Sequence, residues 1–424
     1  MVNEPSLIRV GPEQVNLSFA ERVNEASGQV VQRCYYCQKC SAGCPTAFSM
    51  EYKPARMLRM VQLGLRDTVL TNAALWRCTG CDTCGVHCPN EISIGRVVET
   101  LRELVWRENY LVAEAPPIDE TLQSGLRALS QLGERISTRH NISGEDNQGR
   151  LIWSQNLERV PEGLERKAGA EVLYFVGCVA SFFPRTYRVP QSMTSIMEAA
   201  GVDFTTLGGE EWCCGYPLLS AGLGEQLVLS GAEGIEELAQ HNVAQVKAIG
   251  VKKVVTACPS CYYMWKHVYG KLRGGELDLE VQHSTEFLVE LIESGTISLG
   301  ELKQTVTYHD PCDLGRKSEC YDPPRRVLES IPGLSFVEMA DYRENALCCG
   351  GGGNLETFEP ALVTEVALQR IGQARQVGAE VLVSACQQCE RTFLNALGED
   401  KTRGDKRLRV MDVSELVWRT MEKG

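Results

Sequence analysis

The spacing of its cysteines constrains this chain more than any other feature of the sequence. Nineteen cysteines occur among 424 residues, and eighteen of them fall into two groups of four and two groups of five. The odd total, and a start that has charges where a secretory signal would be apolar, argue against a disulfide framework, because reducing cytosol keeps thiols reduced. The grouping therefore predicts that the cysteines bind metal.

The first two groups share one spacing. Residues 34–45 read CYYCQKCSAGCP and residues 78–89 read CTGCDTCGVHCP, so both follow C-x2-C-x2-C-x3-C-P. This pattern is typical of paired [4Fe–4S] clusters, in which the fourth cysteine of each run ligates the other cluster. The alternative is zinc, which has no use for a third cysteine in each run. Crossed ligation assigns one cubane cluster to Cys34, Cys37, Cys40 and Cys88, and the other to Cys78, Cys81, Cys84 and Cys44.

Helical patterns surround these two motifs. Between them, Pro54 and the apolar residues spaced from Met57 to Leu65 indicate an amphipathic helix, and residues 93–109 indicate another. We therefore predict a helical ferredoxin-like domain over residues 1–110.

A polar segment with two adjacent prolines follows this domain. We interpret residues 111–170 as a connecting segment with one helix near 118–136, and we expect no chemistry in it. The remainder of the sequence divides into two units, at 171–300 and 301–424.

These two units are an internal repeat, which must be recognised before a fold is proposed. Each copy has a lone cysteine, then 34 or 35 residues, then Cys-Cys-Gly, and later a C-x2-C pair. Short β-rich runs precede the lone cysteines and the C-x2-C pairs, and helical stretches lie between, which predicts parallel sheets with thiols at the carboxyl ends of their strands. The predicted fold is mixed α+β and α/β: an N-terminal helical ferredoxin-like domain with two cubane clusters, then two duplicated α/β units.

Glycines follow both pairs of adjacent cysteines. Residues 210–217 read EEWCCGYP and residues 346–354 read ALCCGGGGN. Adjacent side chains of an extended strand point to opposite sides, so both thiols reach one metal centre only at a turn, which Gly215 and Gly350 permit. The uncovered N–H groups can also donate to cluster sulfur. A phosphate-binding loop is disfavoured, because the Lys-Ser/Thr ending is missing.

Two complete five-cysteine repeats behind two ferredoxin motifs resemble heterodisulfide reductase, a member of the cysteine-rich CCG-repeat family. The resemblance is to its C subunit fused to its catalytic B subunit, or to its D subunit, which is a single polypeptide, and it extends over residues 25–420. In that family each repeat holds a noncubane [4Fe–4S] cluster, and a disulfide is cleaved between the two clusters. The resemblance therefore implies two noncubane clusters here besides the two cubane clusters. Their ligands, which also carry the catalysis, would be Cys178, Cys213, Cys214, Cys258 and Cys261 for one and Cys312, Cys348, Cys349, Cys386 and Cys389 for the other.

The resemblance also implies a function and partners. The protein would be an anaerobic oxidoreductase within a complex, taking electrons from a flavoprotein and reducing or forming a disulfide or heterodisulfide. No G-x-G-x-x-G follows a strand, so we expect the flavin in an A-subunit-like partner. Hydrogenase, formate dehydrogenase, other redox subunits or a membrane cytochrome subunit are further partners that it implies. Related subunits share the layout, so a non-catalytic electron relay in a larger dehydrogenase or quinone-linked complex stays open.

Charge and hydropathy narrow the partners further. The formal net charge of −12 argues against nucleic acid and anionic membrane surfaces as partners. The longest apolar run, at 172–183, is too short to span a bilayer. We therefore expect a cytoplasmic protein that reaches a membrane only through a partner.

Several residues near the cysteines have two interpretations. His309 and Asp310, just before the second repeat's lone cysteine, either deliver a proton to a departing thiolate or fix their loop by hydrogen bonds. Cys320 is expected to be a packed or surface thiol rather than a ligand. Tyr262, Tyr263, Trp265 and His267 could line a substrate cavity, although aromatic residues at that spacing are more typical of a core.

Overall fold

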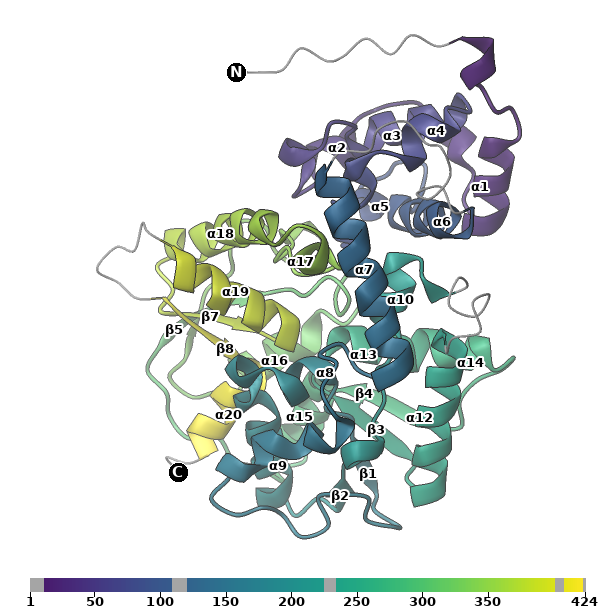
Figure 1. Cartoon of the computed structure of the whole chain (residues 1–424). Coiled ribbons are helices and arrows are strands. Elements are labelled where there is room, and N and C mark those ends of the chain that lie inside the picture. Colours follow the sequence, from purple (N-terminus) through teal and green to yellow (C-terminus); the bar gives the residue numbers. More distant parts are fainter. Residues whose placement is uncertain (1–10, 109–119, 225–233, 401–407, 422–424) are drawn as a thin grey trace.

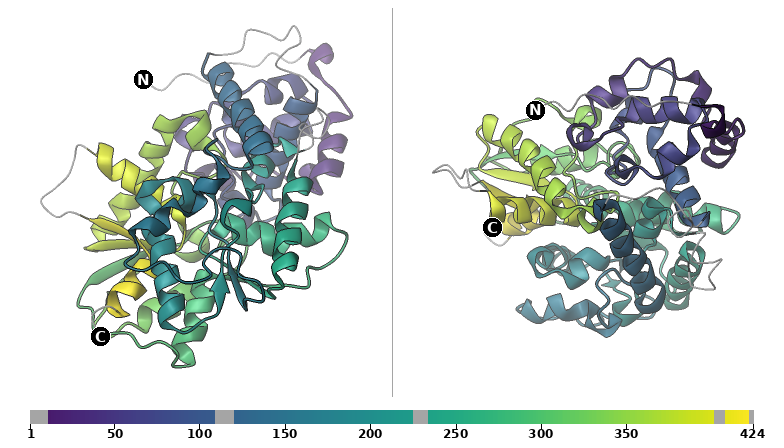
Figure 2. Two further views of the ribbon diagram at one scale, coloured as in Figure 1. Left: turned by 60° about the horizontal axis from the view of Figure 1, so that its bottom comes forward. Right: turned by 45° about the horizontal axis from the view of Figure 1, so that its top comes forward.

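The computed structural model describes residues 11–108, 120–224, 234–400 and 408–421. A helical N-terminal domain lies against an α/β body made of two units (Figure 1), with the second unit beside the first in both views of Figure 2. The predicted fold class is confirmed, because each unit contains a four-stranded sheet whose strand pairs are all parallel. The expected domain boundary at residue 110 falls outside the described residues.

Short helices build the N-terminal domain. They are α1 (Phe19–Ser27), α2 (Lys39–Ala42), α3 (Pro54–Gln62), α4 (Arg66–Leu70), α5 (Thr83–Val86) and α6 (Ile94–Arg107). The helix over 93–109 is confirmed as α6. The helix between the motifs is shorter than its apolar pattern, because the backbone turns at Gly64, whose φ is 71°. A Cβ at Gly64 would lie 2.4 Å from the carbonyl oxygen of Asn16, so glycine is needed for this close approach, and Leu65 lies beyond the end of α3.

The connecting segment contains a long helix and a short one. Helix α7 (Glu120–Arg139) confirms the expected helix from residue 120 onward; residues 118 and 119 lie outside the described part. It runs from the helical domain along the α/β body (Figure 1) and buries Leu122, Leu126, Leu129 and Ile136 along one face, as expected for an amphipathic helix. The 3₁₀-helix η5 (Asn147–Asn156) follows.

The first unit contains a sheet in the order β2-β1-β3-β4. Its strands are β1 (Val172–Tyr174), β2 (Phe204–Thr205), β3 (Lys253–Thr256) and β4 (Glu280–His283). Its helices are α8 (Cys178–Phe182), α9 (Arg188–Ala199), α10 (Tyr216–Ala221), α12 (Ile235–Ile249), α13 (Pro259–Tyr263), α14 (Tyr269–Leu272) and α15 (Ser284–Glu293), with a π-helical turn at Met264–Val268.

The second unit repeats this topology as β6-β5-β7-β8. Its strands are β5 (Thr305–His309), β6 (Ser335–Phe336), β7 (Val381–Ser384) and β8 (Arg409–Asp412). Its helices are α16 (Asp322–Glu329), α17 (Leu355–Phe358), α18 (Pro360–Gln376), α19 (Gln387–Glu399) and α20 (Val413–Met421). The identical strand order agrees with the duplication seen in the sequence.

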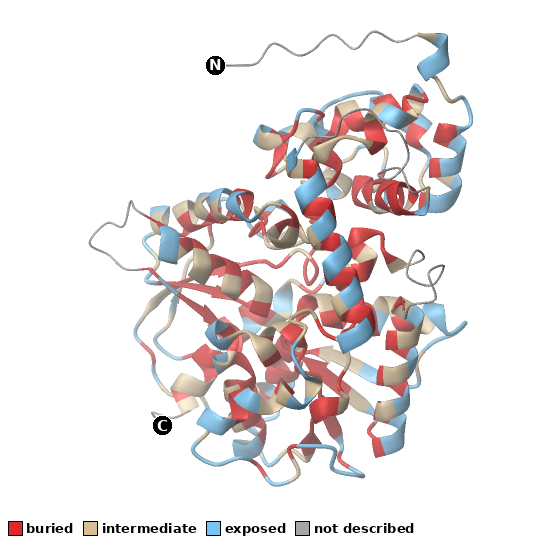
Figure 3. Cartoon of the chain, viewed as in Figure 1, coloured by how far each residue is buried: buried red, intermediate tan, exposed pale blue. Residues whose placement is uncertain are grey.

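One hydrophobic core joins the two units. In β1, Val172 and Tyr174 face a core that also contains Val306 and Val381 of the second unit, whereas Leu173 faces a core of the first unit alone. This alternation follows from the two-residue period of a strand, and it explains why both faces of these strands are apolar. Figure 3 shows the strands as buried and the outer faces of the helices as exposed. The shared core fixes the two carboxyl edges relative to each other.

Candidate metal centres

Four thiols from both ferredoxin motifs surround one small cavity in the helical domain. Cys44 of the first motif lies there with Cys78, Cys81 and Cys84 of the second. Burial, and after it the nearby thiols of Cys81 and Cys78, raises the pKa of Cys44 to about 12. The structure thus brings together the four residues that crossed ligation assigns to one cubane cluster.

The other four cysteines of these motifs lie nearer the surface. Cys37 is exposed, Cys34 and Cys88 are half-buried, and Cys40 is buried. Partial desolvation and the thiols of Cys37, Cys88 and Cys34 raise the pKa of Tyr35, so Cys88 lies beside the first motif. This outer set contains the residues that crossed ligation assigns to the other cubane cluster.

Backbone geometry in these loops suits a sulfur-ligated cluster. Each loop turns at the residue after its second cysteine, where Gln38 and Asp82 have φ values of 65° and 55°. The N–H of Gly80 points at the Sγ of Cys78, 3.4 Å away. Tight loops of thiols with N–H groups aimed at sulfur fit a [4Fe–4S] cluster.

The five cysteines of the first unit gather at the carboxyl edge of its sheet, and all five are buried. Cys178 begins α8 after β1, and Cys258 caps α13 after β3. Gly215, with a φ of 85°, lets the backbone turn from Cys214 into α10.

Cys214 lies in the middle of this set. The neighbouring thiols of Cys213 and Cys261 lower the pKa of Cys214 to about 6. The Cys213 thiol also contacts Cys178, whose pKa is raised well above its ordinary value by this contact and by burial. The five thiols are therefore joined by a continuous chain of contacts, as is expected of ligands of one centre.

The second unit repeats this arrangement. Cys386 caps α19 after β7, and its Sγ accepts a hydrogen bond of 3.4 Å from the N–H of Cys389. The Cys348 and Cys389 thiols, and then His309, hold the pKa of Cys349 well below its ordinary value, although burial opposes them. Cys349 therefore occupies the central place that Cys214 has in the first unit.

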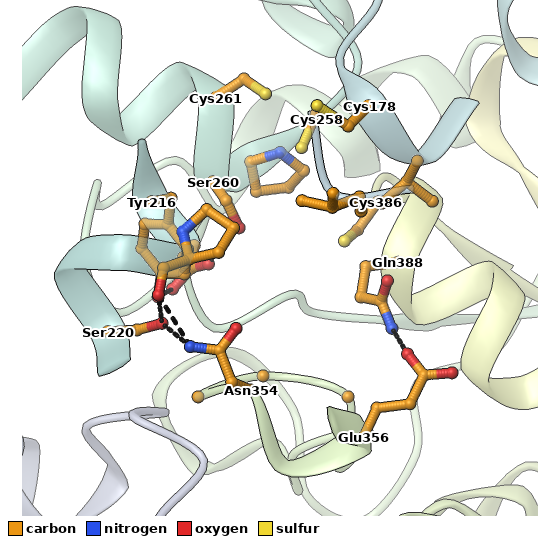
Figure 4. Close-up of a pocket in the computed structure, with 18 of the residues that line it drawn as sticks. Cys178, Tyr216, Ser220, Cys258, Ser260, Cys261, Asn354, Glu356, Cys386 and Gln388 are labelled. Carbon is orange, nitrogen blue, oxygen red and sulfur yellow. Dashed lines mark hydrogen bonds between the residues drawn. The ribbon is translucent and has the colours of Figure 1, made fainter. Parts of the chain in front are cut away.

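Both five-cysteine sets face one cavity of about 340 Å³ between the units. All five cysteines of the first set line it, as do Cys312, Cys349, Cys386 and Cys389 of the second. Figure 4 shows Cys178, Cys258 and Cys261 along one side of this space with Cys386 facing the same interior. Asn354 links the units at the cavity wall, since its Nδ2 donates to the carbonyl of Pro217 and to Ser220 Oγ, each at 2.8 Å. Nine thiols from two distant parts of the sequence thus line one cavity. The tenth, Cys348, is buried next to Cys349 but does not line it.

A polar network also joins the units at this cavity. Asp313 of the second unit accepts hydrogen bonds from Tyr216 Oη at 2.8 Å and from Ser260 Oγ at 2.6 Å. Lys317 Nζ lies 2.7 Å from Tyr216 Oη and 3.1 Å from Asp313 Oδ1. All of these groups except Lys317 line the cavity, so the network orients polar atoms toward its interior.

The inner ferredoxin set touches the second five-cysteine set directly. The adjacent Cys348 thiol, more than any other group, holds the pKa of Cys81 well below its ordinary value. The glycine run allows this approach, because a Cβ at Gly352 would lie 2.7 Å from the carbonyl oxygen of Thr79 and one at Gly353 would lie 2.4 Å from that of Cys78. The third and fourth glycines therefore serve packing against the ferredoxin motif, a role that the sequence analysis missed.

Two buried arginines form hydrogen bonds at this contact between the helical domain and the α/β units. Arg102 of α6 donates to the carbonyls of Leu75 and Cys78 in its own domain and to those of Ser220 and Gly353 in the two units. The Nε of Arg316 donates to the carbonyl of Cys81 at 2.6 Å.

The connecting segment, in which we expected no chemistry, contacts the first five-cysteine set. Arg150 of η5 is 1% exposed, and its Nη2 lies 3.3 Å from the Sγ of Cys178. Burial alone would lower the pKa of Arg150, but the Cys178 and Glu211 side chains raise it. No local motif marks Arg150, because its position against Cys178 depends on how η5 packs on α8.

Proton delivery by His309 and Asp310 does not fit their positions. Asp310 pairs with Arg325 at 2.7 Å, and neither His309 nor Asp310 lines the cavity. Arg370 Nε donates to His309 Nδ1 at 3.3 Å, and the ligand atoms of His309, Cys349 and Cys389 lie within 4.8 Å of one another. The interpretation that these residues fix their loop is the better one.

Of the remaining residues near the cysteines, Tyr263 and His267 are half-buried and the others lie in the core. Cys320 is buried away from the cavity, and burial raises its pKa to about 12. Tyr262 and Trp265 are at most 1% exposed and belong to hydrophobic cores. The structure supports the expectation of packed residues for all three.

Comparisons with known proteins agree with this architecture. A cysteine-rich domain model, CCG, matches residues 172–266 and 306–393, and a 4Fe-4S dicluster domain model matches residues 30–92. These two matches define the class: a protein with a dicluster iron–sulfur domain and two cysteine-rich units. A solved structure of a hypothetical protein from Helicobacter pylori has a similar fold, with a TM-score of 0.53 and 11% identity over 96% of this chain and 73% of that one.

Relatives give the family. The D subunit of dihydromethanophenazine:CoB--CoM heterodisulfide reductase from Methanosarcina acetivorans is 33% identical over 91% of this chain and 92% of its own length. The EtfAB:quinone oxidoreductase from Syntrophomonas wolfei is 29% identical over 88% of this chain and 50% of its own length. This chain belongs to the heterodisulfide reductase D-subunit family of iron–sulfur oxidoreductases. The dicluster match over residues 30–92 supports the presence of [4Fe–4S] clusters in this chain.

The lengths and compositions of the helices also bear on membrane attachment. Among the described residues, no helix has both the length and the apolar character needed to cross a bilayer.

Proposed function

We propose that this protein takes electrons from a flavoprotein partner and reduces a small-molecule disulfide in the cavity between its two α/β units. One observation carries the proposal: nine thiols from both five-cysteine sets line the same cavity of about 340 Å³. This volume includes the space that the clusters themselves would occupy, and the space left between the two sets would suit a small molecule rather than a protein segment. Both sets can therefore act on one substrate.

The cofactors follow from the thiol sets. The inner and outer ferredoxin sets would each hold a cubane [4Fe–4S] cluster, and each five-cysteine set would hold a noncubane one. When bound, these clusters supply single electrons and iron atoms that bond sulfur. Reduction of one disulfide takes two electrons and two protons and gives two thiols. The family relationship and the excess of a fifth thiol in each unit support this assignment.

The exposure of the sets supports an order of electron entry. The outer set reaches the surface at Cys37, and Tyr35 and Tyr36 beside it are exposed, so a flavoprotein donor has access there. The inner set is more buried and touches the second unit through Cys81 and Cys348. We infer that electrons enter at the outer set and reach the cavity through the second unit.

Residues of the protein itself would hold the substrate. Tyr216, Ser260 and Asp313 place hydroxyl and carboxylate groups at the cavity wall, where they can hydrogen-bond a polar substrate.

A second candidate is a non-catalytic relay in a larger complex. It is favoured by relatives such as the EtfAB:quinone oxidoreductase, whose name describes quinone-linked electron transfer. In that case the cavity would hold no substrate, and a membrane-bound partner would accept the electrons.

Metal analysis and two variants test the proposal. Anaerobically purified protein should contain about sixteen irons per chain, the number for four clusters. Cys214→Ser and Cys349→Ser should each remove one noncubane signal in electron paramagnetic resonance and abolish disulfide reduction, while both cubane signals remain. Cys320→Ser is the matched control and should keep all the iron. Eight irons together with zinc, or quinone-linked turnover without any response to disulfides, would favour the relay.

A further inference from the structure

Arg150, a buried arginine of the connecting segment, contacts a thiol of the first five-cysteine set. The Nη2 of Arg150 lies 3.3 Å from Cys178 Sγ, and the side chain is 1% exposed. Cys178 is one of the cavity-lining thiols, so the guanidinium lies directly behind the cavity wall. A hydrogen bond from a cation is stronger than one from a neutral group, and in a dry interior its charge is weakly screened.

The other N–H groups of Arg150 hold it in this position. Nη1 pairs with Glu211 at 2.8 Å, Nε donates to Asn147 Oδ1 at 3.1 Å, and Nη2 also donates to the carbonyl of His140 at 3.3 Å. Glu211 is itself fixed, because its carboxylate accepts the N–H groups of Val176 and Gly177, each at 2.9 Å. The residue just before Cys178 is therefore part of the same buried network.

The second unit is built differently at the corresponding places. His309 lies three residues before Cys312, where the first repeat has Phe175, and it approaches Cys349 rather than the lone cysteine. Because Arg370 Nε donates to His309 Nδ1, the ring proton is left to Nε2, which has no hydrogen-bond partner in the part of the chain that the structure describes. His309 is therefore a neutral group near Cys349 and Cys389. Arg316 carries the nearby positive charge, but its Nε and Nη1 donate to the carbonyls of Cys81, Glu344 and Ala346, and its Nη2 has no hydrogen-bond partner among the described residues.

We propose that Arg150 is a positioning residue that raises the reduction potential of the iron–sulfur centre of the first unit through its charge-assisted hydrogen bond to Cys178. A cation beside a ligand thiolate favours the reduced, more negative state of the centre, and hydrogen bonds to ligand sulfur act in the same direction. Electrons that enter through the second unit would then reduce the centre of the first unit preferentially, because its reduction potential is higher. The inference rests on the proposed cluster in the first unit.

Two variants with opposite expected signs test the inference in the full-length protein. Arg150→Gln removes the charge, so the midpoint potential of the first-unit signal should shift to more negative values. Glu211→Gln leaves the arginine charge without its counterion, so the same midpoint should shift to more positive values. The measurement is an anaerobic redox titration followed by electron paramagnetic resonance, with the first-unit signal assigned as the one that Cys214→Ser removes. His309→Phe is the matched control, because it should shift the second-unit signal and leave the first-unit midpoint unchanged.

The outcomes separate this inference from the proposed function. If Cys214→Ser removes no signal, the proposed cluster is absent and the proposed function fails. If the signal is present and Arg150→Gln and Glu211→Gln leave its midpoint unchanged, or shift it in the same direction, the tuning role of Arg150 is wrong. If Arg150→Gln loses iron, the Glu211→Gln titration decides alone: a positive shift supports the role, and no shift or a negative shift overturns it.

Discussion

At the scale of single residues, the glycine run after Cys349 serves two purposes. Gly350 has a φ of 89°, so the backbone can turn directly after the cysteine pair. Gly352 instead gives the ferredoxin motif room to approach, because a Cβ there would lie 2.7 Å from the carbonyl oxygen of Thr79. A backbone carbonyl cannot move aside as the end of a flexible side chain can.

Gly352→Ala should therefore weaken the junction between the helical domain and the second unit. Overpacking of this kind costs about 1–3 kcal/mol. The midpoint of urea unfolding of the anaerobic protein should fall accordingly. Gly372→Ala is the control: it lies within α18 with nothing within 4 Å of a built Cβ, and alanine favours a helix interior by up to about 1 kcal/mol. If both variants were equally stable, the close approach of Thr79 would be unimportant.

At the scale of elements, Cys258 and Cys386 each cap a helix just after a strand, and His283 occupies the same kind of position. It is the last residue of β4 and the N-cap of α15, where its Nδ1 accepts the N–H of Thr285 at 3.3 Å. The side chain is fully buried, and burial lowers the pKa of His283 to about 3.

This histidine should make the protein sensitive to mild acid. Its pKa in the folded protein lies below the ordinary value of about 6.5, so the unfolded state binds the proton more tightly. The stability that buried, neutral His283 contributes to the folded protein is therefore complete above pH 6.5. It is lost as the pH falls toward 3, by up to about 1.4 kcal/mol per pH unit. His283→Asn keeps an oxygen for the N-cap and removes the titration. The unfolding free energy of the anaerobic wild type should fall more steeply between pH 7.5 and 5.5 than that of the variant, and equal slopes would refute this.

At the scale of the whole molecule, Arg102 joins all three parts of the structure. Its guanidinium donates to carbonyls of the helical domain and to one carbonyl in each α/β unit, and the side chain is 1% exposed. The guanidinium carbon of Arg102 also lies 5.4 Å from the centre of the Trp76 ring, so the side chain packs on an aromatic surface at the same point. The relative positions of the inner ferredoxin set and the cavity thus depend in part on this side chain, together with Arg316 and the close approach of the glycine run.

Arg102→Met should loosen this arrangement without changing the helix. Methionine has similar length and no donor, so buried carbonyls would lose partners at about 1–3 kcal/mol each. Hydrogen exchange should accelerate at residues 78–81 and 350–353, and electron transfer from the ferredoxin sets to the cavity should slow. Arg96→Met, an exposed change on the same helix, should do neither. Unchanged exchange in Arg102→Met would show that the apolar contacts suffice.

Residue spacing alone was enough to predict the fold class and the grouping of the thiols. The C-x2-C-x2-C-x3-C-P runs, the repeat offsets and the β-rich runs are local patterns, and the helices α6 and α7 and the strands β1, β3, β5 and β7 lie where these patterns placed them. Such features depend on neighbours along the sequence, because helix and strand periods and metal-ligand spacing are local geometry.

What the sequence by itself determined is therefore which residues belong to each thiol set, and what only the tertiary structure decided is which sets and side chains meet. The contact of Arg150 with Cys178, the approach of Cys81 to Cys348 and the closure of both five-cysteine sets around one cavity join residues that are distant in the sequence. No local pattern encodes these contacts. They arise because the two units bury one shared hydrophobic core, which turns the carboxyl edges of two separate sheets toward the same space.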